Sequence, residues 1–162
     1  MRISLLPPIA RRVIEDRKGA AVVELGLVLP VILFLFAGIV DVSRYVCAKI
    51  DVEQAAQRTT AFALAKRPTS SSVAYLIPEA TAAAGVPSSN VTAELFLECN
   101  GVRQSKYDNP CPAGETSGRF VRVSIRRAVA FQFNWTALAG MLGMKSMGSN
   151  ITVTGNSLMR IQ

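Results

Sequence analysis

Residues that could carry out catalysis are scarce in this sequence. The chain has 162 residues and contains no histidine, which removes Ser-His and Cys-His catalysis and the commonest metal ligand. The stretch from Gly114 to Gly118 is rich in glycine but lacks the Gly-Lys-Ser/Thr ending of a phosphate-binding loop. Lys145 and Ser146 are adjacent, with no sign of a catalytic dyad. We therefore expect no enzymatic activity, no catalytic residue and no cofactor.

Three cysteines remain: Cys47, Cys99 and Cys111. The last two bracket a stretch rich in Asn, Gly and Pro, which is typical of a loop. In an oxidising compartment we expect them to form a disulfide, and two unpaired thiols are the alternative. The chain has no Cys-x-x-Cys pair, so we expect no metal site. For Cys47 we expect burial as a small apolar residue, with an intersubunit disulfide or lipidation as alternatives.

Gly19 and Glu24 stand at the boundary between a basic leader and an apolar run. Residues 1–19 hold five basic and two acidic residues, and Glu24 is the fifth residue after Gly19. A carboxylate inside an apolar segment is costly in a membrane and is usually functional. The alternative is that Glu24 is simply an interfacial residue. The coincidence of this spacing with the boundary makes both residues functional candidates.

The apolar run that follows has the length of a membrane span. No residue is charged from Leu25 to Val40, and a helix over residues 20–40 would be about 30 Å long, the hydrocarbon thickness of a bilayer. Pro30 is expected to kink this helix, which membrane segments tolerate. A buried helix of a soluble domain is the alternative, but a small domain has little room to hide it on all sides. The basic leader places the N-terminus in the cytoplasm.

The helix is expected to continue beyond the apolar run, from about Ala20 to Arg67. Its second half is amphipathic and needs a partner surface, because apolar residues at three-four spacing share one face: Tyr45, Ala48, Val52, Ala55, Thr59 and Phe62. The expected organisation is a leader peptide at 1–19, a transmembrane segment at 20–40, the amphipathic continuation at 41–67 and an extracytoplasmic domain at 68–162.

The C-terminal domain mixes helix and strand signals. The predicted elements are a helix at 73–84, strands at 91–98, 120–126 and 151–161, and a helix at 135–142. Gly85 would end the first helix, and Asn134 and Gly143 would cap the second. The fold class is therefore α+β, with a long helix packed on a small antiparallel sheet. The net charge of +7 forms no basic stripe interleaved with aromatics, so we expect no nucleic-acid binding.

The head of the helix resembles TadE-like minor pseudopilins of the tight-adherence (Tad or Flp) pilus, a type IV pilus system. The likeness runs through GAAVVELGLVLPVILFLFAGIVDVSRYVCAKIDVEQAAQRTTAFALA. Gly-x-x-x-x-Glu before an apolar helix is the processing pattern of type IV prepilins. The proline, the Gly-Ile-Val-acid and the Ala-rich amphipathic helix are similar as well. The resemblance covers residues 17–67, and ITVTGNSLMRIQ is a weaker likeness. Many relatives have an aromatic residue where this chain has Leu25.

The resemblance implies a pilin-like fold and a role in pilus assembly, and hence in adhesion and biofilm formation. A prepilin peptidase would cut after Gly19, where no side chain blocks the approach to the backbone. Ala20 would then carry a free amine, with which Glu24 of an adjoining subunit can pair. The implied partners are the peptidase, other pilin and pseudopilin subunits, the inner-membrane assembly platform and the lipid bilayer. The implied location is the bacterial inner membrane, single-pass, with a cytoplasmic N-terminus and a periplasmic C-terminal domain, or the pilus itself.

There are two rival interpretations of the apolar segment. An ordinary secretory signal needs an A-x-A-like site after the apolar core, and residues 37–46 offer none that is convincing. A membrane-anchored periplasmic binding or sensor module would keep its leader. An intact Met1 would favour that module, whereas a mature chain beginning at Ala20 would favour the pseudopilin.

Overall fold

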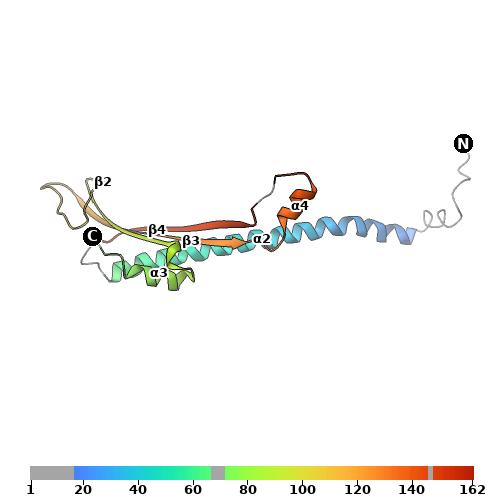
Figure 1. Cartoon of the computed structure of the whole chain (residues 1–162), viewed down its shortest axis with the longest axis horizontal. Helices are drawn as coiled ribbons and strands as arrows, with labels where there is room; N and C mark the ends of the chain where they lie inside the picture. The colour runs from blue at the N-terminus through green and yellow to red at the C-terminus, as the bar shows by residue number, and fades with distance from the viewer. Residues whose placement is uncertain (1–16, 67–71, 146–147) are drawn as a thin grey trace, which may run out of the picture. The chain divides into compact units, whose positions relative to one another are not determined.

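The chain is an α+β protein, as predicted. A computed structural model describes residues 17–66, 72–145 and 148–162 (Figure 1), so most of the expected leader lies outside the described residues. Its elements are α2 (Arg17–Ala65), α3 (Leu76–Ala84), η1 (Ser88–Asn90), β1 (Val91–Cys99), β2 (Val102–Arg103), β3 (Ser117–Ala130), α4 (Trp135–Met141) and β4 (Asn150–Arg160). The chain divides into two compact units after Asp41. The second unit, Val42–Gln162, holds the rest of α2 and the whole sheet.

Helix α2 runs without a break through 49 residues, close to the predicted bounds. Pro30 lies inside it and the helix continues past this residue, so the kink stays a prediction. Among the described residues, one helix has the length and apolar composition to cross a membrane, Ala21–Ala65. No residue in its most apolar 18-residue window is buried within the structure.

The sheet has four antiparallel strands in the order β2-β1-β3-β4. The three predicted strands are present, but β3 extends beyond the predicted 120–126 at both ends. β2 was not predicted, because its two residues fall inside the turn-rich stretch between the cysteines. Pairing with the end of β1 makes these two residues a strand: Cys99 lies opposite Val102.

One face of the sheet packs on the second half of α2. The alternation predicted for β3 is confirmed, because Val121, Val123 and Ile125 are fully buried. They share a core with small residues of α2, whose 3.6-residue period presents one stripe to the sheet. The buried stripe differs from the predicted one, since Ala56 and Ala63 are also buried and Tyr45 is exposed.

Helix α3 packs beside α2 and adds its buried residues to the same core. Leu76, Ala80 and Ala84 are its buried residues, and Figure 1 shows α3 beside the end of α2, where Arg58 and Glu79 form an ion pair of 3.3 Å. The predicted caps are present. Gly85 is left-handed with φ of 61° and its N–H donates to Thr81 O, as favoured at a helix C-terminus.

The approach of β4 to α2 depends on Gly155. A Cβ at this position would lie 2.3 Å from the carbonyl carbon and oxygen of Val52 and 2.6 Å from the nitrogen of Glu53. These are backbone atoms of the helix, so they cannot turn away as a side chain can. Two hydrogen bonds join α2 to β4, one on each side of Gly155. Lys49 Nζ donates to Thr154 O at 2.5 Å, and the hydroxyls of Thr60 and Ser157 lie 2.8 Å apart.

Candidate functional site

The three residues expected at the processing site lie in the first two turns of α2. The helix begins at Arg17, so the Gly19–Ala20 bond falls in its first turn. Glu24 follows Ala20 by four residues, which places the two on one helix face. The Glu24 side chain is exposed and forms no ion pair with another described residue. A partner for its charge would therefore have to come from outside the described part of the chain.

Gly19 has no structural role within the described residues. Its backbone is not in the left-handed region, and a Cβ built there meets no atom within 4 Å. A glycine inside a helix costs about 1 kcal/mol relative to alanine. The same open space surrounds Gly26, seven residues further along. Larger residues at either position would thus fit the folded chain.

The first unit presents an almost continuous apolar surface. Its large apolar side chains are exposed around the whole helix, and among them are Val22, Leu27, Val31, Leu35 and Ile39. A monomeric protein in water rarely exposes so much apolar surface. This surface must therefore be covered by lipid or by other chains.

Cys47 is exposed, so the expectation that it is buried was wrong for this chain by itself. The reason is the helical period. Ala48 and Val52 point into the core, and Cys47 lies one residue before Ala48, about 100° around the helix. Its thiol therefore faces away from the sheet.

The loop at the far end of the sheet is closed by a disulfide between Cys99 and Cys111. The two Cα atoms are 5.7 Å apart, which suits such a bond. Cys99 is buried at the end of β1, whereas Cys111 is half-buried in the loop. The bond thus ties the loop and the short β2 to the main sheet.

A cluster on the outer face of the sheet holds β2 in place. Glu94 of β1 forms ion pairs with Arg103 of β2 at 2.8 Å and with Arg122 of β3 at 3.0 Å. Both guanidinium groups also lie over the Phe96 ring, at 4.3 and 5.4 Å. The hydrogen bond from Arg103 lowers the pKa of Glu94 from its usual value, and Arg122 lowers it further. Because this pKa is lowered, the stability from the cluster is present above the unfolded-state pKa and is lost as the pH falls through the folded-state pKa.

We predict that Cys99→Ser lowers the stability of the second unit by about 3 kcal/mol, the contribution expected of a short disulfide-closed loop. Protease cleavage should increase between residues 100 and 111, while membrane association stays the same. Non-reducing peptide mapping and thermal unfolding measure both effects. Cys47→Ser is the matched control, since Cys47 is a free, exposed thiol. Two freely alkylated thiols at positions 99 and 111 in protein isolated from cells would contradict the prediction.

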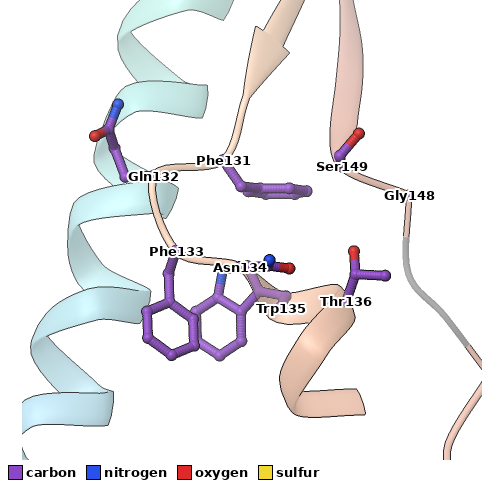
Figure 2. A pocket seen from close by; sticks show the side chains of 8 residues that line it. All are labelled: Phe131, Gln132, Phe133, Asn134, Trp135, Thr136, Gly148 and Ser149. Atoms are coloured by element: carbon purple, nitrogen blue, oxygen red, sulfur yellow. The ribbon is translucent and has the colours of Figure 1, made fainter. Parts of the chain in front are cut away.

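The end of the sheet opposite the disulfide-closed loop carries a compact group of aromatic residues. Residues 131–136 leave β3 and enter α4, whose first turn is capped by Asn134 accepting from the N–H of Ala137 at 3.0 Å. Figure 2 shows the rings of Phe133 and Trp135 side by side, and their centroids are 4.8 Å apart in an edge-to-face arrangement. These residues, with Gly148 and Ser149, line a cavity of about 270 Å³.

No described group of three or more His, Cys, Asp or Glu side chains could hold a metal ion.

Residues 19–60 match a protein family described as TadE-like protein. No curated protein and no solved structure matches the chain.

Proposed function

We propose, from the match of residues 19–60 to the TadE-like family, that the chain is a minor pilin-like subunit that helps to assemble a Tad-type pilus. A prepilin peptidase removes residues 1–19, and the subunit then supports adhesion and biofilm formation. The apolar segment anchors it in the bacterial inner membrane, with the domain in the periplasm until it joins a filament. Its partners are the peptidase, the assembly platform and other pilin subunits.

The observation that carries this proposal is the arrangement of α2. One continuous helix is exposed and apolar at its head and packed on a sheet in its second half. Such a helix can lie in lipid before assembly and against the apolar helices of neighbouring subunits afterwards. Glu24 and the glycine before it lie at the start of the apolar part, where a charge-assisted contact can set the register between subunits.

The experiment that tests this proposal is the intact mass of the protein purified from the membrane of its own cells. A mature chain beginning at Ala20 is the expected result. A chain that retains Met1 would contradict processing and favour an unprocessed membrane-anchored binding or sensor module.

We predict that Glu24→Ala leaves the protein stable and inserted but poor in pilus assembly. The carboxylate has no ion-pair partner among the described residues, so its loss should not disturb the fold. The measurement is the amount of surface pili in a deletion strain that carries the variant at a normal protein level. Glu115→Ala, which removes an exposed acid at the far loop, should assemble normally. Normal piliation with Glu24→Ala would show that this acid is only an interfacial residue.

A further inference from the structure

We propose that the tip of the sheet formed by residues 131–145, with α4 at its centre, rests on the bilayer surface and inserts its apolar side chains among the lipids. This inference rests on the proposed membrane anchoring, and it adds a second lipid contact that the apolar segment of α2 does not contain. We call residues 131–145 the membrane tip.

The first observation is where the membrane tip lies within the second unit. The side-chain amide of Gln132 lies against the Arg44 guanidinium, and with its oxygen turned toward the guanidinium it accepts from both terminal nitrogens. Arg44 follows Val40, the end of the uncharged run, by four residues in the same helix, about 6 Å along its axis. Gln132 therefore lies against α2 about one helical turn beyond the uncharged run that we propose to span the bilayer.

The second observation is the surface of the membrane tip. Met141 is 86% exposed, Leu142 65% and Met144 58%. They follow one another at the end of α4 and in the turn after it, where Gly143 has a left-handed φ of 67°. Three exposed large apolar side chains within four residues indicate an interaction surface. Helices with large apolar residues on one side insert such residues into the boundary between headgroups and acyl chains.

The third observation is charge and aromatic content. Residues 131–149 contain no Asp or Glu, and their one charged residue is Lys145. Together with Arg44 this makes the membrane tip complementary to anionic lipid headgroups. Trp135, half-buried against Phe133, has the amphipathic ring that is enriched at membrane interfaces. A lipid surface therefore fits these features better than a polar protein partner does.

The opposite end of the sheet differs from the membrane tip in its charges. Strand β3 has 14 residues, so its two ends are about 45 Å apart. The far loop, residues 100–116, contains both acids and bases and the disulfide. Acidic residues are thus present at the far end of the sheet and absent from residues 131–149, as expected if the membrane tip faces anionic lipid.

The sequence offers a direct probe, because Trp135 is the only tryptophan of the chain. The full chain is reconstituted in vesicles of phosphatidylcholine and phosphatidylglycerol whose acyl chains carry bromine near the headgroup or near the bilayer centre. We expect loss of Trp135 fluorescence with shallow bromine and a smaller loss with deep bromine. In the control, Trp135→Phe with Val102→Trp, the probe sits at the exposed far loop and its fluorescence should not change.

A paired substitution tests the apolar patch itself. Met141→Asp with Leu142→Asp should reduce the quenching of Trp135 while the protein still floats with the vesicles, and Val102→Asp should leave the quenching unchanged. Trp135 that stays unquenched in a chain that floats with the vesicles would overturn the membrane tip alone. Trp135 emission that changes only with the number of protein chains per vesicle would also overturn the membrane tip. It would mean that the patch docks on a second copy of the chain. A chain that does not float would overturn the proposed anchoring, and this inference with it.

Discussion

Gly19→Val should abolish removal of the leader while leaving membrane insertion and the fold of the domain intact. The structure gives Gly19 open space and an ordinary helical backbone, so valine can be accommodated by the chain itself. A peptidase has to bring its catalytic groups to the Gly19–Ala20 peptide bond, and a branched side chain next to that bond blocks the approach. The expected result is complete loss of the trimmed form, measured by the mass of the membrane-extracted protein.

The chain provides a matched control in Gly26→Val. Gly26 has the same open surroundings as Gly19 and lies in the same helix, so the same substitution perturbs the fold equally little. We expect this variant to be trimmed normally, because Gly26 is seven residues from the proposed cut. Normal trimming of Gly19→Val would contradict the peptidase proposal, and failure of both variants would point to a general effect on the helix.

Gly155→Ala should destabilise the second unit by about 3 kcal/mol, at the upper end of what overpacking of a core typically costs. The added methyl would have to share space with the backbone of Val52 and Glu53. The strand can avoid this only by moving away from α2. That movement would stretch the hydrogen bonds from Lys49 to Thr154 and between Thr60 and Ser157, so more than one contact is lost.

Thermal unfolding of the full chain in detergent, followed by circular dichroism, measures this loss. Gly140→Ala is the control, since a Cβ there meets no atom within 4 Å and the residue lies in α4. That change should be neutral or stabilise by up to about 1 kcal/mol, because alanine favours the helix over glycine. Equal stability of Gly155→Ala and Gly140→Ala would show that β4 and α2 are not held as tightly as the structure indicates.

Local patterns in the sequence determined most of the secondary structure. The uncharged run and the three-four spacing after it predicted α2 within three residues at each end. Asn134 and Gly85 predicted their caps because a side-chain acceptor and a left-handed residue are needed at those helix ends. The alternation at 120–126 predicted the buried face of β3. Each of these signals works over a few residues, so it can be read without knowing the fold.

Contacts between distant residues were decided by the tertiary structure alone. Nothing near Gly155 in the sequence indicates that Val52 will lie against it, 103 residues away. Phe96 alternates with Leu95 and Leu97 along β1 and so lies on the face of the sheet away from α2, yet it is only 4% exposed. Two arginines from neighbouring strands cover its ring. The pairing that made β2 a strand likewise depends on where β1 ends.

The same division applies to the functional residues. Gly19 and Glu24 could be singled out from the sequence because their meaning lies in a boundary between charged and apolar residues along the chain. The membrane tip could not, because Met141 and Leu142 read as ordinary helix residues until Gln132 is seen against Arg44. The burial expected of Cys47 was wrong for a related reason. Its apolar character could be read from the sequence, but the face of α2 that meets the sheet is chosen by packing, and Cys47 lies outside that face.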